Sequence, residues 1–198
     1  RQWMSLDDDR MPTLMEHYKV PHCDAKGEAN QAFTDRGVPT TFLLTSFYWE
    51  NLLQGMVAPS ADGVLTLTLP MGDAKLPGIA AEDIGRCAYA LFQDSSTYIG
   101  RTVGIAGEHL TGVEMTSALS DALGTTVHYH AVDPATYREF GFPGAEDLGN
   151  MFQFKRDFND DFCDARNVSR SRQLNPDLQS FDDWLAVNKR WFSLPQPA

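Results

Sequence analysis

Two basic side chains, His22 and Lys26, stand one helical turn apart in the run His22-Cys23-Asp24-Ala25-Lys26. On a helix this spacing puts both side chains on one face. Imidazole is the side chain that gains and loses a proton near neutral pH, so His22 is a candidate proton carrier. Lys26 adds a positive charge beside it. A single lysine on a helix is usually just solvated, so the pair alone leaves a structural interpretation open.

Cys23 lies beside His22, and a cationic neighbour can turn a thiol into a reactive thiolate. Nothing in the sequence shows that this happens, and a structural thiol is the preferred interpretation. The chain has three cysteines, widely spaced and without a Cys-x-x-Cys pair. Reduced thiols of a cytoplasmic protein are therefore expected.

His128 and His130 alternate with Tyr129, so both fall on one face of an expected strand. Some metal sites use this spacing, but no third ligand is obvious, and exposed or half-buried strand histidines are the preferred interpretation. The aspartates between residues 157 and 164 resemble a calcium loop without its glycine and its closing glutamate, so a solvated segment is expected there. We predict no metal site.

The familiar sequence signatures of enzymes are missing. Gly100, Gly104 and Gly107 do not have the spacing of a dinucleotide-binding Gly-x-Gly-x-x-Gly loop, and turn glycines are the preferred interpretation. There is no Walker loop, no His-Glu-x-x-His and no Gly-x-Ser-x-Gly. Short motifs alone therefore leave the function open.

The charge balance excludes some partners. The 198 residues include 16 Lys and Arg against 27 Asp and Glu, a formal net charge of −11. Phosphate backbones are bound by clustered Lys and Arg, so direct nucleic-acid binding is not expected. No apolar stretch approaches the roughly 20 residues of a membrane span, so no membrane-spanning helix is predicted.

Helices and strands are expected to alternate along the chain, which predicts an α/β fold. Thr111 and Glu114 form a capping box, and Gly37 and Gly124 are placed to end helices. Helices are expected at 24–36, 81–92, 111–123, from 134 to about 141, 145–158 and 181–191, and strands at 40–47, 64–69, 102–106 and 127–132.

Five longer runs are more specific than any of these patterns. They are residues 22–28 (HCDAKGE), 37–41 (GVPTT), 48–53 (YWENLL), 69–73 (LPMGD) and 141–152 (GFPGAEDLGNMF). With the spacings between them, they resemble the NmrA-like family over about residues 17–192. This family is an atypical group of short-chain dehydrogenases and reductases, and the resemblance is strongest to its NADP-sensor branch.

The resemblance implies the C-terminal part of an NAD(P)-binding Rossmann-like fold with a smaller α+β substrate-side domain. Residues 1–55 would be the remnant of the dinucleotide-binding domain, and residues 56–198 would be mostly the substrate-side region of a single NmrA-like domain. The family's glycine-rich loop, its basic residue for the 2′-phosphate and about four strands would lie upstream of residue 1. We therefore expect a fragment with an incomplete cofactor site and with weak or no NADP binding.

The resemblance also implies roles for individual residues. The lysine that matches Lys26 contacts the ribose and the nicotinamide end of NADP. Tyr48, Trp49, Glu50 and Asn51 match residues that line the nicotinamide side of the cleft. His22 stands where the related enzymes carry the tyrosine of their Tyr-x-x-x-Lys pair, a tyrosine that the sensor members lack. His22 and, as a second candidate, Tyr48 are therefore the possible proton donors.

The function that follows is that of a cytoplasmic NAD(P)(H)-binding regulatory or redox-sensor protein. The alternative is an NAD(P)H-dependent reductase, an oxidoreductase acting on quinone-like or other small electrophiles. A scaffold that has lost the cofactor is the third interpretation. NADP is the expected cofactor, with NAD left open, and the dinucleotide is the expected partner. A regulatory protein partner and a homodimer also stay open.

Overall fold

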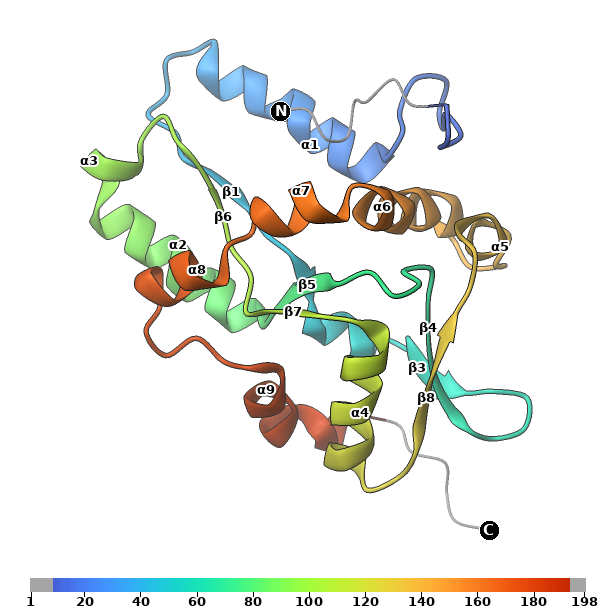
Figure 1. Cartoon of the computed structure of the whole chain (residues 1–198). Coiled ribbons are helices and arrows are strands. Elements are labelled where there is room, and N and C mark those ends of the chain that lie inside the picture. Colours follow the sequence, from blue (N-terminus) through green and yellow to red (C-terminus); the bar gives the residue numbers. More distant parts are fainter. Residues whose placement is uncertain (1–8, 193–198) are drawn as a thin grey trace.

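The computed structural model describes residues 9–192, which form an α/β fold (Figure 1). The helices are α1 (Pro21–Thr34), α2 (Ala81–Gln93), α3 (Ser95–Tyr98), α4 (Gly112–Leu123), α5 (Pro134–Arg138), α6 (Ala145–Asp157), α7 (Asn159–Asp164), α8 (Val168–Leu174) and α9 (Phe181–Asn188), with 3₁₀ turns η1 (Trp49–Leu53) and η2 (Lys189–Trp191). The strands are β1 (Phe42–Leu44), β2 (Phe47–Tyr48), β3 (Val57–Pro59), β4 (Leu65–Leu69), β5 (Leu76–Ile79), β6 (Thr102–Gly104), β7 (Glu108–Leu110) and β8 (Val127–Ala131).

The strands form three small sheets within the described residues. β1 pairs with β6 in parallel, β5 lies between parallel β2 and antiparallel β7, and β4 lies between antiparallel β3 and parallel β8. Each sheet thus contains a parallel pair, whose strands must be joined by crossover segments. The α/β class expected from the sequence is confirmed.

Elements whose pattern and capping agree form where the sequence predicts them. β4 alternates buried and half-buried residues, with its leucines inward. At the start of α4, Thr111 accepts a hydrogen bond from the Glu114 N–H while the Glu114 carboxylate accepts one from the Thr111 N–H, which confirms the capping box. Gly124 ends α4 with φ +67°, a conformation that glycine adopts at little cost.

The strand expected at 40–47 is divided into β1 and β2 by Thr45 and Ser46. The Thr45 carbonyl, which a continuous strand would use in its ladder, instead accepts a hydrogen bond from Arg166 Nε at 2.7 Å. The break lets β1 pair with β6 while β2 pairs with β5. The two parallel pairs therefore begin a few residues apart on the same segment of chain.

The sequence pattern fails to predict the buried strand β5, because Leu76-Pro77-Gly78-Ile79 contains the two residues most typical of turns. All four residues are buried. Gly78 is required by packing, because a Cβ atom at this position would collide with the indole of Trp49. Here tertiary packing overrides local propensity.

The first helix starts at Pro21, three residues before the position that the pattern indicates. Asp24 does not cap it from outside. Its carboxylate reaches back and accepts hydrogen bonds from the N–H groups of Lys19 and Val20, each at 2.9 Å. This contact fixes the chain at the entrance to α1.

The acidic segment 157–164, expected to be solvated, forms the end of α6 and the whole of α7. Its aspartates are solvated or half-buried on the surface of these helices. Asn167 then caps α8 by accepting a hydrogen bond from the Arg170 N–H. Charge composition therefore predicted exposure but not helix.

The division at residue 55 stays a prediction, and residues 1–8 and 193–198 of its two parts lie outside the described residues. The β1–β6 and β2–β5 pairs join strands from both sides of residue 55.

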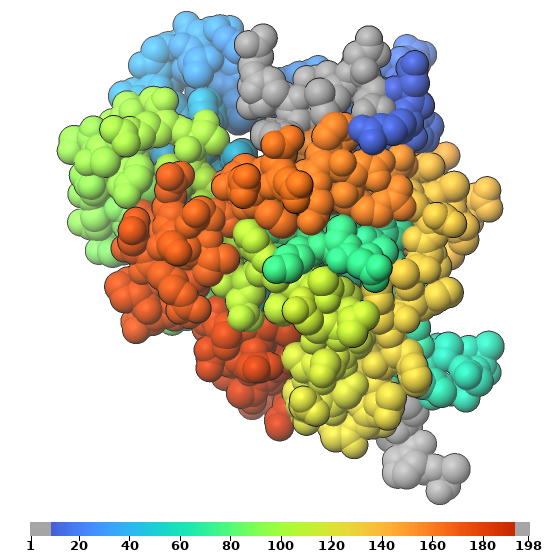
Figure 2. Space-filling model, in the orientation of Figure 1, coloured from blue at the N-terminus to red at the C-terminus, as the bar shows by residue number. Residues whose placement is uncertain are grey.

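In the space-filling view, α6 and α7 form a ridge between α1 and the rest of that face (Figure 2). Within residues 9–192, no helix is both long and apolar enough to cross a membrane.

Candidate functional site

The first turns of α1 and α6 meet through His22 and Asp147 (Figure 1). Nδ1 of His22 lies 2.7 Å from Oδ2 of Asp147, and the backbone N–H of His22 donates to the same oxygen at 3.3 Å. An ionised carboxylate only accepts, so Nδ1 carries the hydrogen. Nε2, which makes no hydrogen bond within the described residues, is then the acceptor nitrogen. The pair can therefore accept a proton at Nε2 and stabilise the resulting imidazolium.

The second half of the run 141–152, which lies in α6, holds the segment of chain that leads into α1. Asn150 is fully buried, and its Nδ2 donates to the carbonyls of Pro12 and Lys19. Gln153 donates to the carbonyl of Arg10, and Arg138 donates to the amide oxygens of both side chains. The run 141–152 thus contributes Asp147 and Asn150, which fix the position of His22.

Lys26 lies one turn after His22 on α1 and is exposed. Within residues 9–192 its ammonium forms no hydrogen bond or ion pair. An exposed lysine without a protein partner can bind a hydroxyl or an anion at no cost in broken contacts. The structure therefore leaves Lys26 available for the ribose contact that the resemblance implies.

The four consecutive residues predicted to line the cofactor lie in different environments. Tyr48 is 40% exposed, and its hydroxyl lies 3.2 Å from Thr45 Oγ1. Trp49 is only 1% exposed and packs against Phe181 and Trp184, with ring centroids 5.3 and 6.1 Å away. Asn51 is half-buried. Of Tyr48 and Trp49, only Tyr48 has a side chain that faces solvent.

Glu50 is occupied by structural contacts. Its carboxylate accepts hydrogen bonds from the Ala81 N–H at 3.0 and 3.1 Å and from Trp184 Nε1 at 3.1 Å. Ala81 is the first residue of α2, so Glu50 satisfies a helix N-terminus as well as a buried indole. Its predicted cofactor role remains untested, and these contacts give it a structural role.

The side chain of Lys155 on α6 is almost entirely buried, with 7% exposed. Its ammonium nitrogen lies 6.0, 5.3 and 5.6 Å from the ring centroids of Phe47, Phe152 and Phe162. It makes no ion pair or hydrogen bond with any described residue. Burial lowers the pKa of Lys155 to about 7, and Arg166 contributes to the shift.

Arg166 is a second buried cation without a carboxylate partner among the described residues. Its guanidinium stacks 3.6 Å from the centroid of Phe162 and donates to the carbonyls of Thr45 and Phe162. Burial lowers the pKa of Arg166 to about 10. The Ser46 hydroxyl, next to Thr45, is buried and has no hydrogen-bond partner in this part of the chain.

Cys23 packs against the main hydrophobic core, and burial raises the pKa of its thiol, against the opposing effect of Lys155 and Lys26. A raised pKa keeps the thiol protonated and favours the structural interpretation. Cys23, Cys87 and Cys163 are all free.

Sequence reasoning did not assign a role to Asp147, Lys155, Arg166 or Ser46. The motif 141–152 contained Asp147, but no pattern showed that it would meet a histidine 125 positions earlier. Lys155 follows the apolar run Met151-Phe152-Gln153-Phe154, and a lysine inside such a run is a signal that could have been used.

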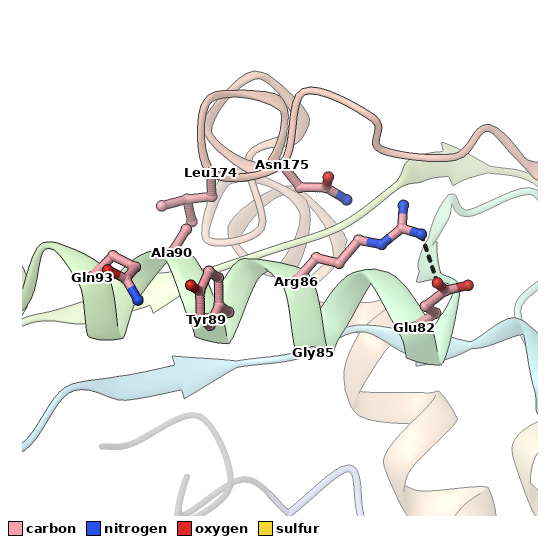
Figure 3. Close-up of a pocket in the computed structure, with 8 residues that line it drawn as sticks. All are labelled: Glu82, Gly85, Arg86, Tyr89, Ala90, Gln93, Leu174 and Asn175. Atoms are coloured by element: carbon pink, nitrogen blue, oxygen red, sulfur yellow. Dashed lines mark hydrogen bonds and ion pairs between the residues drawn. The ribbon is translucent and has the colours of Figure 1, made fainter.

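Two surface pockets lie elsewhere. One, of about 630 Å³, lies between α2 and the end of α8, where Arg86 is bonded to Glu82 at 2.6 Å (Figure 3). The other, of about 300 Å³, contains His128 and His130, which are exposed on β8 as expected. Among residues 9–192, no group of three or more His, Cys, Asp and Glu residues could hold a metal ion. Neither pocket contains a predicted site residue.

Comparison with known proteins places these features in a family. The model of the NmrA-like family matches residues 3–185. Prestalk A differentiation protein A of Dictyostelium discoideum is 26% identical over 128 residues, which cover 61% of this chain and 42% of that protein.

Solved structures have the same fold. NmrA, a negative transcriptional regulator solved in complexes with NADP and with NAD, gives a TM-score of 0.59 at 20% identity, over 76% of this chain and 52% of NmrA. The NADPH complex of a quinone oxidoreductase from Escherichia coli gives 0.63 at 17% identity, over 80% of this chain and 56% of the other. These structural neighbours bind NADP or NAD, and this chain spans about half their length.

Proposed function

The chain belongs to the NmrA-like family, and from that membership we propose that it is an NAD(P)(H)-binding regulatory or redox-sensor protein. Lys26 binds the ribose next to the nicotinamide, and His22, Tyr48 and Asn51 border the nicotinamide itself. Trp49 and Glu50 support this side of the site through the core contacts described above. The remaining parts of the dinucleotide are held by residues outside this half of the fold.

The observation that carries the proposal is the state of Lys26. It is exposed and unpartnered among the described residues, one turn after a histidine that Asp147 holds in place. α1 leads through Gly37 into β1, and ligands of parallel α/β sheets bind beyond the carboxyl ends of the strands. Tyr48 is the last residue of β2, at such an end.

A titration with the two halves of the cofactor tests this assignment. We expect this chain to bind reduced nicotinamide mononucleotide in the millimolar range and adenosine 2′,5′-bisphosphate not at all. Intact NADPH should bind no better than the nicotinamide half, because the pyrophosphate contacts of a glycine-rich loop are missing. Isothermal titration calorimetry and NADPH fluorescence provide the measurements.

The matched variants are Lys26→Met in the site and Lys189→Met, which removes the same charge from η2. Lys26→Met should abolish binding of the mononucleotide, and Lys189→Met should not. Micromolar NADPH binding by this chain would contradict the incomplete site. Mononucleotide binding that survives in Lys26→Met would contradict the role of Lys26.

The second candidate function is an NAD(P)H-dependent reductase of quinone-like or other small electrophiles, and the His22–Asp147 pair favours it. A histidine whose Nδ1 is held by a carboxylate is oriented for proton transfer at Nε2. Hydride transfer to a quinone leaves an oxyanion that must be protonated, and His22, once protonated at Nε2, would supply that proton. Tyr48 is the second donor, because its hydroxyl is partly exposed.

Steady-state oxidation of NADPH with a panel of quinones separates the two functions, using these residues preceded by a glycine-rich dinucleotide-binding half. Turnover that falls at least tenfold in His22→Ala or in Tyr48→Phe would identify the enzyme. Tight NADPH binding with no turnover would identify the sensor. His128→Ala, on an exposed strand, serves as the control for both.

NADP is the cofactor we propose, with NAD as the alternative, because the resemblance does not assign any of these residues to the 2′-phosphate. Dinucleotide occupancy would bias the choice of a regulatory protein partner. We place the protein in the cytoplasm, in keeping with its three free cysteines. A homodimer would appear in equilibrium sedimentation as an average molar mass that rises with protein concentration.

A further inference from the structure

The two histidines of β8 have no part in the proposed function. His128 and His130 are both exposed, and both line the surface pocket of about 300 Å³ described above. Among residues 9–192, neither imidazole makes a hydrogen bond or an ion pair. Their ring nitrogens are therefore available to a ligand from outside the chain.

The strand that carries these histidines is held firmly from its other face. Tyr129 lies between them in sequence and packs against α4, where a Cβ atom at Gly112 would collide with its ring. The Tyr129 hydroxyl donates to the carbonyl of Gly72 at 2.9 Å. On a strand, residues i and i+2 share a face and lie roughly 7 Å apart. Imidazoles at this spacing can bind one ion, and imidazole is a ligand that Zn²⁺ prefers.

One copy of the chain supplies only part of a metal site. Structural zinc sites are almost always four-coordinate. Within residues 9–192, no group of three or more His, Cys, Asp and Glu residues could hold a metal ion. His128 and His130 therefore provide two ligands of four, and the other two must come from another molecule.

The outer edge of β8 is open among the described residues. β8 is the last strand of its sheet and pairs only with β4 (Figure 1). The Val132 N–H donates to a carbonyl of β4, so by alternation the backbone groups of Tyr129 and Ala131 point away from β4. These groups have no hydrogen-bond partner within residues 9–192. Nearer the start of the strand, the Val127 N–H donates to Ser120 Oγ at 2.9 Å.

A second copy of β8 fits this edge and completes the set of ligands. In an antiparallel pairing centred on Tyr129, the outward backbone groups of Tyr129 bond to those of its own copy. His128 of each copy then lies opposite His130 of the other, in pairs without backbone hydrogen bonds, whose Cβ atoms are about 5 Å apart. A two-fold axis perpendicular to the sheet keeps all four imidazoles on one face.

We propose that Zn²⁺ joins two copies of this chain along their β8 edges, with His128 and His130 of each copy as its four ligands. The site is incomplete in either copy alone. It lies outside the proposed dinucleotide site, so its failure would leave the proposed function untouched.

The charges around the pocket agree with a cation at this contact. Each copy carries a formal net charge of −11, so two copies repel each other, and a divalent cation between them offsets part of the repulsion. Asp62 lines the same pocket as His128. A hydrogen bond from Ser60 is the main cause that lowers the pKa of Asp62, and His128 contributes to the shift. Carboxylates beside metal-binding imidazoles commonly accept a hydrogen bond from the ring nitrogen that does not hold the metal.

Equilibrium sedimentation and calorimetry of this chain, prepared without a histidine tag, test the proposal with zinc chloride. Zn²⁺ should double the average molar mass and should bind with a stoichiometry of one ion per two chains. Mg²⁺ prefers oxygen ligands, so it should leave the mass unchanged. Doubling of the mass by Mg²⁺ would show that screening of the acidic charge is sufficient, and it would overturn the proposal.

His128→Ala and His130→Ala each remove two of the four ligands. Each should weaken Zn²⁺ binding at least tenfold and abolish the doubling of the mass. His17→Ala, at an exposed position outside β8, is the matched control and should retain both. Circular dichroism of each variant verifies the fold.

Two measurements on the unmodified chain locate the contact. Hydrogen exchange of the Tyr129 amide should slow at least tenfold when Zn²⁺ is added, and it should not slow in His130→Ala. X-ray absorption at the zinc edge should show four nitrogen ligands at about 2.0 Å. The proposal is overturned if Zn²⁺ binds without a rise in mass, or if the doubling survives in His128→Ala or His130→Ala. It is also overturned if the exchange of the Tyr129 amide does not change.

Discussion

Two regions of the molecule cover their apolar side chains to different extents. One is the aromatic core, which consists of Trp49, Phe181, Trp184 and Phe192. The other is the amino-terminal layer, which consists of α1 and β1. In the core, Phe181 stacks on Trp184 at 5.9 Å with an interplanar angle of 9°, and all four rings are buried. In the layer, Phe33 is 51% exposed. The three residues of β1 are half-buried and, among residues 9–192, pair on one edge only, with β6.

An apolar pattern therefore predicts where a helix or strand forms, but its apolar face is buried only where another element packs against it. Ala25, Ala29, Ala32 and Phe33 follow the spacing of a buried helix face, and α1 forms where they occur. Within residues 9–192, however, no element covers this face, and all four residues are exposed. The core has partners from distant segments, and Glu50 links two of them by bonding α2 and Trp184.

The largest expected effect comes from breaking the core. Trp184→Ala removes a ring that contacts Trp49, Phe181 and Phe192 and leaves a cavity. We expect a loss of about 3–5 kcal/mol in the free energy of unfolding. Trp191→Ala is the matched control, because Trp191 is 62% exposed, and it should change stability by less than about 0.5 kcal/mol. Urea denaturation of both variants measures the contrast, and similar losses would refute it.

The next effect concerns Lys155, which is buried among the rings of Phe47, Phe152 and Phe162. Its pKa in the folded chain is lowered from 10.5 to about 7, so between these values the unfolded chain binds more protons. The cost of the buried charge is complete below pH 7 and is relieved as the pH rises toward 10.5. Lys155→Met should therefore stabilise the chain by ~3 kcal/mol at mildly acidic pH.

This advantage of Lys155→Met should shrink by roughly 1.4 kcal/mol for each pH unit above neutrality. Urea titrations of both chains over a pH series measure the difference, in which the titrations of Cys23 and the other groups that the two chains share largely cancel. Lys189→Met, at an exposed position, should show no such dependence. A difference that does not vary with pH would contradict the buried ammonium.

A smaller effect is expected from Glu50→Gln, which tests whether this residue stabilises the core. The amide keeps one acceptor oxygen but loses the charge that faces the N-terminus of α2. We expect a loss of about 1–2 kcal/mol. Asp94→Asn, at an exposed position just after the end of α2, is the control and should have little effect. If Glu50→Gln leaves stability unchanged, its carboxylate is free for the predicted cofactor role.

Local patterns predicted those elements whose capping, periodicity and packing agree. The capping box at Thr111, the alternation of β4 and the family resemblance carried by residues 141–152 were all recognisable in the sequence. β5 was missed because Pro77 and Gly78 are typical of turns, and the need for Gly78 appears only in its packing against Trp49.

The site was only partly predictable. His22 and Lys26 are close in sequence, and their spacing on a helix places them together. Asp147, Lys155 and Arg166 come from segments more than 120 residues away, so their contacts depend on tertiary packing that no local signal encodes. For Trp49 and Glu50 the motif 48–53 was too inclusive. It predicts that both residues line the site, but a motif of this kind also contains residues that only support the site through packing and hydrogen bonds.

The smallest expected effect is in the amino-terminal layer. Phe33→Ser replaces a ring that is already half in water, so little apolar area is lost from the interior. We expect stability to change by less than about 0.5 kcal/mol, whereas Phe152→Ser, at a buried position of α6, should cost at least about 3 kcal/mol. Because Ser also removes an exposed apolar surface, Phe33→Ser should reduce aggregation at high concentration, as measured by light scattering. A loss of stability above ~1 kcal/mol in Phe33→Ser would mean that a surface other than residues 9–192, such as a second copy of the chain, covers this face. That loss would then depend on protein concentration, which equilibrium sedimentation of the original chain would detect.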